Sequence, residues 1–346
     1  MRIHYDHQVF SLQDTGGNTR YHFELMRHLA AHNGVDIDLF LGWYPSENLG
    51  ACHPERSEGP LLSDSLQVRY PEGVGAPSFR PPLAKGWVSN SGGGGGKLHI
   101  TLWDSSLPPG PRRYLINDLL NSAHALRHGR YDIYHPTHHR YLPLIRARRM
   151  VVTLHDCTQE KFPAEFRYND RVLRYRKALF ARADAIICIS QASRQDLLRF
   201  YKVDEGKTRV IHHGVTRLAP PADSARTEFP SKETPHRGQS ARPYLLYVGS
   251  RALYKNFRAL LQAFHDSGLY REFDLRLVGG GPLAPEDARL IAELGLTQTI
   301  IHREGVDDAF LAEAYSGARL LAYPSLSEGF GLPPLEAIPG NNRGSN

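Results

Sequence analysis

Short apolar or β-branched runs alternate with amphipathic helical patterns along most of the chain, and this alternation restricts the fold more than any other feature. Strands separated by helices pair in parallel sheets whose faces the helices cover, so a helical bundle or an antiparallel sandwich is disfavoured. A chain of 346 residues also exceeds what one hydrophobic core usually supports. We therefore predict an α/β protein with two doubly wound domains.

The expected strands are short apolar runs, and the expected helices repeat apolar residues every three or four positions. We expect strands at residues 2–6, 35–41, 133–135, 150–154, 185–189, 209–212, 244–248, 275–278, 300–301 and 320–323. We expect helices after Gly17 and at residues 117–128, 166–180, 191–200, 257–264, 286–294 and 308–316. Strands and helices thus alternate in both halves of the chain, as two parallel sheets require.

Two stretches carry no periodic pattern and divide the chain. Residues 46–96 end in five consecutive glycines, and residues 218–243 are rich in Pro, Ser, Thr and charge but poor in large apolar residues. Such segments are typical of loop insertions and linkers. We therefore predict a first domain over residues 1–217 with an irregular insert, a linker or insert over 218–243, a second domain over 244–338 and a tail over 339–346.

The chain carries a formal net charge of +6 at pH 7. This surplus favours a negatively charged partner, and nucleic acid, an anionic membrane surface and a diphosphate are the alternatives. Arg167, Arg171, Arg174 and Lys177 recur at spacings of three and four, so they form one basic stripe of an expected helix. The stripe is either a solvated helix face or a contact for lipid phosphates. It lacks the aromatic and basic motif of a known nucleic-acid-binding module, so we expect no nucleic-acid partner.

The sequence predicts neither export nor a membrane span. It contains no run of 18 apolar residues, and its first residues lack the apolar stretch of a secretory signal. Cys52, Cys157 and Cys188 have no C-x-x-C spacing, so neither a disulfide framework nor a zinc knuckle is indicated. We expect a cytoplasmic protein with reduced thiols.

Residues 325–337 place two carboxylates, Glu328 and Glu336, eight positions apart around a glycine loop that leads into a helix start. Gly329 and Gly331 permit positive φ angles and a close approach of the backbone to a ligand. Two prolines follow and suit the first helical turn, in which Glu336 falls. A surface loop before a capped helix is the alternative for such a segment taken alone.

This segment resembles the Glu-x7-Glu signature of the family-four retaining glycosyltransferases, which have the GT-B fold and move a sugar from a nucleotide-sugar to an acceptor. Further stretches are similar to motifs of that family and follow its order: a glycine loop at 16–21, a histidine segment at 152–156, a serine turn at 189–193 and a phosphate-binding element at 247–256. The resemblance covers most of residues 1–338. It implies two Rossmann-like domains facing across a cleft, with ligands at the carboxyl ends of the strands.

Candidate residues of the first domain follow from their places beside expected strands and helices. Gly16 and Gly17 precede a helix, whose amide groups and dipole suit phosphate oxygens of the donor or an acceptor hydroxyl. A plain turn is the alternative. His155 follows an expected strand and so lies at its carboxyl end. The matching histidine of the family lies against the transferred sugar, so the resemblance implies a catalytic, donor-positioning role for His155; a structural histidine is the alternative.

In the second domain, Arg251 and Lys255 follow the strand at 244–248 and a Gly-Ser turn. A guanidinium fork and an ammonium beside a helix start suit a diphosphate leaving group, whose departure leaves negative charge. Two solvated surface charges are the alternative. We therefore expect these side chains to bind the donor diphosphate.

The resemblance assigns the carboxylate loop to the rest of the donor. It implies that Glu328 contacts the transferred sugar with Gly329, Phe330 and Gly331 beside it, and that Glu336 accepts hydrogen bonds from the ribose hydroxyls. It also implies retention of anomeric configuration, with the donor phosphate assisting deprotonation of the acceptor. The scheme needs no cofactor and no metal. The donor is a nucleotide-sugar such as a GDP- or UDP-sugar, and the sequence leaves its base open.

His135, His138 and His139 lie close together in the sequence. A metal site is one interpretation, but neither a carboxylate nor a cysteine shares a ligand-like spacing with them. We favour a wall that contacts the acceptor.

The function that the resemblance implies is transfer of a hexose to a glycan or lipid-linked acceptor in surface polysaccharide or lipopolysaccharide synthesis. Mannose is the sugar commonly moved by relatives with this style of Gly-Gly and His-Asp segments, and peripheral contact with the inner face of the membrane fits a lipid-linked acceptor. Members of the family continue beyond the segment that matches Glu336, so we expect an incomplete second domain. The alternative is a truncated, non-catalytic remnant or a module that binds a sugar nucleotide.

Overall fold

The computed structural model describes residues 1–12, 17–44, 96–104, 111–139, 145–166, 169–215, 242–306 and 308–338. The chain forms two compact units, Met1–Cys157 with Tyr168–His212 and Thr158–Arg167 with His213–Asn346. The predicted tail lies outside the described residues, as do most of the predicted insert and linker.

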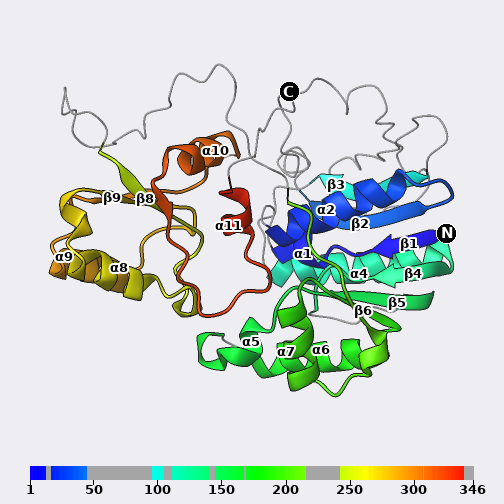
Figure 1. Ribbon diagram of the computed structural model, residues 1–346. Helices are drawn as coiled ribbons and strands as arrows, with labels where there is room; N and C mark the ends of the chain where they lie inside the picture. The colour runs from blue at the N-terminus through cyan, green and yellow to red at the C-terminus, as the bar shows by residue number, and fades with distance from the viewer. Residues whose placement is uncertain are drawn as a thin grey trace, which may run out of the picture. The chain divides into compact units, whose positions relative to one another are not determined.

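The first unit is built on a parallel sheet of seven described strands in the order β3-β2-β1-β4-β5-β6-β7 (Figure 1). These strands are β1 Arg2–Tyr5, β2 Asp36–Tyr44, β3 Lys97–Asp104, β4 Tyr131–His135, β5 Ala147–Leu154, β6 Ala185–Cys188 and β7 Thr208–Val210. The helices of the unit are α1 Gln8–Leu12, α2 Gly17–Ala30, α4 Pro111–His128, α6 Asn169–Arg182 and α7 Gln191–Phe200, with the 3-10 turn η2 Glu205–Lys207. Parallel neighbours need crossover connections, and described helices supply them between β1 and β2, between β5 and β6, and between β6 and β7.

Successive residues of β2 point to opposite faces of the sheet, and each face has its own helix. Ile37 packs with Phe23 and Met26 of α2 in one core cluster. The next residue, Asp38, lies 3.0 Å from His124 of α4. The sheet is therefore covered on both faces, as in a doubly wound domain.

The second unit contains a parallel sheet in the order β10-β9-β8-β11. Its strands are β8 Tyr244–Val248, β9 Asp274–Val278, β10 Ile300–Arg303 and β11 Leu320–Leu321. Its helices are α5 Thr158–Lys161, α8 Phe257–Asp266, α9 Pro285–Glu293, α10 Asp308–Gly317 and α11 Leu332–Glu336, with the turns η1 Pro163–Glu165, η3 Leu253–Lys255 and η4 Leu269–Arg271. Alternate residues of β8 again separate the faces: Leu245 packs with α8 and α9, whereas Leu246 packs with α10.

The predicted α/β architecture is confirmed, and most element ends shift by a few residues. The predictions for α7 and β8 are correct at both ends, whereas α4 begins at Pro111, six residues earlier than predicted. β11 has two residues rather than the predicted four, because the chain leaves the sheet early to enter the carboxylate loop. Among the described helices, none combines the length and the apolar character that crossing a bilayer requires.

One strand escapes the sequence analysis. β3 follows the glycine run directly, and its Leu98, Ile100 and Leu102 are buried. These residues alternate with polar ones, which is the period of a strand with one buried face. The sequence therefore contained the alternating pattern of this strand, but the pattern directly follows the irregular segment and was not assigned to a strand.

Candidate active site

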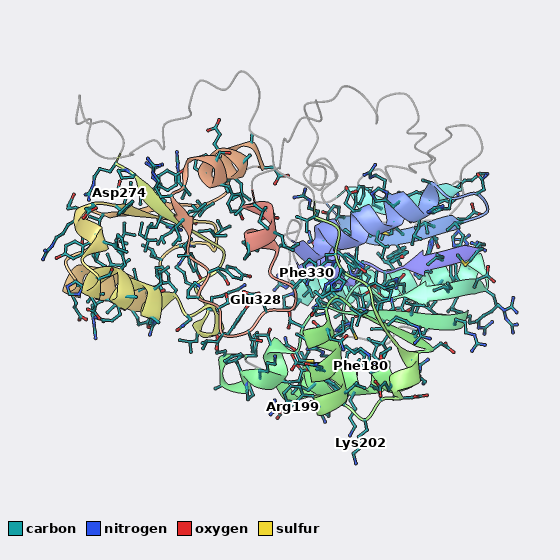
Figure 2. The ribbon with its side chains drawn as sticks, viewed as in Figure 1. Phe180, Arg199, Lys202, Asp274, Glu328 and Phe330 are labelled. Atoms are coloured by element: carbon teal, nitrogen blue, oxygen red, sulfur yellow. The ribbon has the colours of Figure 1, made fainter. Side chains whose placement is uncertain are left out.

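The segment that carries both predicted carboxylates runs from β11 to α11 in the second unit, and Figure 2 labels Glu328 and Phe330 on it. Gly331 is the N-cap of α11 with φ 85°, in the left-handed region that glycine adopts readily. The role predicted for Gly329 stays a prediction. A single left-handed residue immediately before the helix is enough to turn the chain. Glu336 is the last residue of the short helix rather than part of a longer first turn.

Glu328 forms an ion pair with Lys255, whose Nζ lies 2.6 Å from Oε1. The two side chains are 23% and 18% exposed, so a ligand can reach them. The ring centre of Tyr323 lies 5.8 Å from the ammonium, and burial, followed by the interaction with Glu328, raises the pKa of its phenol. Glu328 of the loop and Lys255 of the turn before α8 therefore place a carboxylate and a cation side by side at an accessible position.

A sharp backbone turn places Lys255 immediately before helix α8. Lys255 ends the turn η3, and Asn256, with φ 56°, caps the helix in the left-handed conformation. Asparagine tolerates this conformation better than most residues. Phe257 then anchors the first turn of α8 in the core. The ammonium is thus held close to the positive end of a helix dipole, where anions are favoured.

Arg251 is engaged with the glycine loop that follows β9. Its Nη1 donates to the carbonyl oxygen of Gly279, and its Nη2 donates to those of Gly280 and Pro282, each at 3.0 Å. A Cβ added to Gly280 would lie 2.5 Å from the carbonyl oxygen of Gly249, so the two loops approach too closely for any side chain there. The guanidinium predicted to bind diphosphate therefore also holds this loop.

Glu336 and Phe330 have partners that the sequence analysis does not anticipate. Tyr315 of α10 donates a hydrogen bond of 2.9 Å to Oε2 of Glu336. The ring of Phe330 meets that of His213 edge to face at 5.3 Å. Burial lowers the pKa of His213 to about 4, so its ring is neutral near pH 7.

In the first unit, His155 directly follows β5, as predicted. The ring of Tyr21 lies 5.0 Å from it and that of His22 lies 5.7 Å from it. The side chain of Ser193 donates a 3.0 Å hydrogen bond to the carbonyl oxygen of His155. Gly17 is the first residue of α2, whereas Gly16 lies outside the described residues.

His135, the last residue of β4, and His139, which follows that strand, have a structural role. His135 lies 2.9 Å from the hydroxyl of Thr153, and Nε2 of His139 lies 2.8 Å from the carbonyl oxygen of Thr153. Their exposed fractions are 3% and 9%. Burial of both rings and their contacts with Thr153 of β5 disfavour the predicted contact with an acceptor. Burial also lowers the pKa of His135 to about 4.

Comparison with known proteins decides the family. Residues 15–217 match Glycosyltransferase Family 4, and residues 230–339 match the Glycosyl transferases group 1. The chain belongs to Glycosyltransferase Family 4. Among curated relatives, this family-four glycosyltransferase is 34% identical over 225 residues to O-antigen chain mannosyltransferase B of Escherichia coli, covering 62% of the chain and 57% of the relative. It is 26% identical over 209 residues to O-antigen chain mannosyltransferase RfbU of Salmonella typhimurium, covering 59% and 53%. The chain thus spans little more than half the length of these relatives.

Solved structures share the fold of this family-four glycosyltransferase. Sucrose-phosphate synthase from Thermosynechococcus elongatus superposes with a TM-score of 0.61 at 20% identity, covering 97% of this chain and 78% of the other. WaaG, a glycosyltransferase involved in lipopolysaccharide biosynthesis, gives 0.61 at 15% identity with the same coverage. HepE of Anabaena, solved in complex with UDP-glucose, gives 0.58 at 16% identity. The predicted GT-B type of α/β fold is confirmed.

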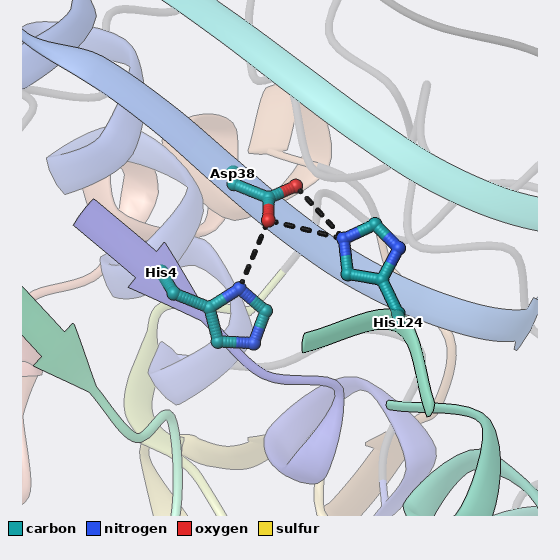
Figure 3. Close-up of side chains that lie close together, drawn as sticks. All are labelled: His4, Asp38 and His124. Carbon is teal, nitrogen blue, oxygen red and sulfur yellow. Dashed lines mark hydrogen bonds and ion pairs between the residues drawn. The ribbon is translucent and has the colours of Figure 1, made fainter. Parts of the chain in front are cut away.

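The family-four chain also contains a buried polar cluster in its first unit, formed by His4, Asp38 and His124 (Figure 3). Nδ1 of His4 lies 3.2 Å and Nε2 of His124 lies 3.0 Å from Oδ2 of Asp38, and Tyr131 donates to the same oxygen at 2.5 Å. Burial opposes ionisation, but hydrogen bonds from His124 and His4 outweigh it and hold the pKa of Asp38 well below its ordinary value. The three residues offer metal-ligand atoms within 4.8 Å of one another. Their mutual hydrogen bonds account for the cluster as an internal network of the scaffold.

Proposed function

We propose that the protein transfers a hexose, with mannose as the first candidate, from a nucleotide-diphospho-sugar to a glycan or lipid-linked acceptor in surface polysaccharide or lipopolysaccharide synthesis. The curated relatives named above are O-antigen chain mannosyltransferases, which supports the sugar and the setting. The observation that carries the proposal is the accessible pair of Lys255 and Glu328, since it joins a cation for phosphate to a carboxylate for sugar hydroxyls.

The ammonium of Lys255 and the guanidinium of Arg251 stabilise the negative charge of the departing diphosphate. An ammonium has three N–H donors, so Lys255 can keep Glu328 on one donor while a phosphate oxygen takes another. Arg251 acts in two ways. Its charge stabilises the diphosphate, and its hydrogen bonds to the carbonyl oxygens of Gly279 and Gly280 hold the loop after β9. Gly17 is the first residue of α2, and we propose that it and Gly16 add amide groups to the contacts with the diphosphate.

Glu328 accepts hydrogen bonds from hydroxyls of the transferred sugar, beside the backbone of Gly329, Phe330 and Gly331. Glu336 accepts hydrogen bonds from the ribose hydroxyls. Carboxylates suit both tasks because they only accept hydrogen bonds and have several lone pairs for vicinal hydroxyls.

His155 is assigned to the reacting sugar as a catalytic residue that positions the donor. Its place after β5 supports the assignment, since ligands of doubly wound sheets bind beyond the carboxyl ends of strands. We further propose transfer with retention, in which the donor phosphate takes up the proton of the attacking acceptor hydroxyl. Arg251 and Lys255 supply the positive charge in this scheme, so EDTA is expected to leave turnover unchanged.

Calorimetric titration with GDP, UDP and ADP tests the proposal most directly. Saturable binding of one of them, followed by sugar transfer from the corresponding nucleotide-sugar, is the expected result. Binding without transfer to any glycan or lipid-linked acceptor would instead favour a sugar-nucleotide-binding module. A folded sample that binds none of the three would overturn the proposal.

We also propose peripheral contact with anionic lipid at the inner face of the membrane. The described part of the predicted basic stripe supports it: Arg171, Arg174 and Lys177 are all exposed on α6, whereas Arg167 lies outside the described residues. Each basic residue near an anionic surface contributes about 1 kcal/mol. The stripe can therefore hold the enzyme near a lipid-linked acceptor.

A further inference from the structure

Two tyrosines lie beside the two carboxylates of the glycine loop, one beside each. Tyr315 donates to Oε2 of Glu336 at 2.9 Å, and the ring centre of Tyr323 lies 5.8 Å from the Lys255 ammonium that pairs with Glu328. The tyrosines are eight positions apart in the sequence, and so are the glutamates. Each carboxylate thus has its own phenol from the preceding helix or strand end.

Tyr315 joins Glu336 to the core of the second unit. It lies on α10, where it packs against the cluster that contains Tyr244, Leu246 and Ala314. Burial, followed by the charge of Glu336, raises the pKa of Tyr315, so the phenol keeps its proton and remains a donor. α11 has only five residues and its N-cap makes no side-chain hydrogen bond. A helix this short has little stability of its own, so a contact with the core is needed to orient Glu336.

Tyr323 follows β11 and lies beside the pair of Lys255 and Glu328. Burial, followed by the interaction with Glu328, raises its pKa, so this phenol keeps its proton and can donate to that carboxylate. Glu328 is therefore flanked by the ammonium of Lys255 at 2.6 Å and by the phenol. The phenol can therefore keep the Glu328 carboxylate in its orientation when a ligand takes over one of the N–H donors of Lys255.

We propose that Tyr315 and Tyr323 are positioning residues for the donor, with Tyr315 orienting Glu336 toward the ribose and Tyr323 orienting Glu328 toward the transferred sugar. The inference rests on the function proposed above. It assigns the two phenols to different parts of one ligand, so their removal has different effects.

The test compares Tyr315→Phe and Tyr323→Phe by calorimetry with the nucleoside diphosphate that the wild type binds, with its 2′-deoxy form, and with the intact nucleotide-sugar. Tyr315→Phe is expected to weaken diphosphate and nucleotide-sugar alike, by about tenfold for a lost charge-assisted hydrogen bond. It should also reduce the preference for the ribose form over the 2′-deoxy form. Tyr323→Phe is expected to leave diphosphate binding unchanged and to weaken only the nucleotide-sugar or lower kcat.

Tyr270→Phe is the matched control, because this tyrosine lies in the same unit and its ring stacks on His265. Thermal unfolding shows whether each variant folds. Glu336→Gln and its combination with Tyr315→Phe provide a second test. If Tyr315 acts through Glu336, Tyr315→Phe should cause no further loss of affinity once that carboxylate is gone. Additive losses in the double variant would overturn the inference.

Wild-type affinity of Tyr315→Phe for the diphosphate would also overturn it, as would loss of diphosphate binding in Tyr323→Phe. These outcomes leave the proposed function intact. If the wild type binds none of GDP, UDP and ADP, the proposed function fails and the inference fails with it.

Discussion

Asp38 in the first unit and Glu328 in the second are both carboxylates that face side chains able to carry positive charge, yet their surroundings differ. The side chain of Asp38 is 11% exposed and bonded to two imidazoles and a phenol of the scaffold. The side chain of Glu328 is 23% exposed, and its main partner is Lys255. A carboxylate satisfied by buried partners offers a ligand no access, whereas an accessible ion pair can exchange one partner for a ligand. Exposure, more than residue type, separates scaffold from candidate site.

The largest effect is expected from Asp38→Asn, because the change leaves buried donors without their charged acceptor. We expect the free energy of unfolding to fall by about 3 to 5 kcal/mol. Urea unfolding followed by tryptophan fluorescence measures it, since Trp43, Trp87 and Trp103 all lie in the first half of the chain.

Asp170→Asn, at an exposed position of α6, is the control and should change stability by less than about 0.5 kcal/mol. Nucleotide affinity of the folded Asp38 variant should equal that of the wild type. A stability loss no larger than the control's would show that the network does not stabilise the scaffold as inferred here.

A second prediction concerns pH and the buried histidines of the first unit. The unfolded chain takes up a proton on His135 near pH 6.5, whereas the folded protein does so only near pH 4. The unfolded state therefore binds more protons between these values, so the free energy of unfolding decreases as the pH falls from about 6.5 to 4. This single group contributes about 3 kcal/mol to the decrease.

Urea titrations at several pH values compare the wild type with His135→Gln, which should show a smaller decrease. His28→Gln is the control, because that side chain is 70% exposed. An unchanged pH dependence in His135→Gln would contradict the assignment of His135 as a buried neutral ring.

In the second unit, Lys255→Ala should remove about 2 to 4 kcal/mol of transition-state stabilisation. The value of kcat/KM should therefore fall roughly 30-fold to 1,000-fold. The fold should change little, because the ion pair is accessible to solvent. Steady-state kinetics with the nucleotide-sugar measures the loss, and the exposed Lys202→Ala is the control. Unaltered turnover and donor affinity would remove Lys255 from the site.

Arg251→Ala sharpens the distinction between the two cations of the second unit. We expect a loss of transition-state stabilisation of similar size, about 2 to 4 kcal/mol, together with a lower Tm. The additional instability follows from the lost hydrogen bonds to Gly279, Gly280 and Pro282. A variant with normal stability would mean that these bonds contribute little to the loop.

Sequence reasoning predicts elements better than contacts in this protein. Local periodicity places β8 and α7 correctly, because burial on a sheet face and a serine cap are encoded within a few residues. The bond between Tyr315 and Glu336 joins residues 21 positions apart, and the network at Asp38 joins four elements of the first unit. Such pairs depend on strand order, which no local pattern specifies. The available hint was a polar residue, such as His4 or Asp38, inside an apolar strand.

The smallest effect is expected for the described residues of the basic stripe, Arg171, Arg174 and Lys177, which are exposed on α6 and form no ion pair with another described residue. Arg174→Ala should weaken binding to vesicles that contain anionic phospholipid by about 1 kcal/mol, or roughly fivefold, because one charge near the surface is lost. Co-sedimentation at low and high salt measures this loss. Arg289→Ala, whose side chain is 81% exposed on α9, is the control. Binding that persists in high salt, or equal binding to neutral vesicles, would identify the stripe as a solvated helix face, because an electrostatic contact is screened by salt and requires anionic lipid.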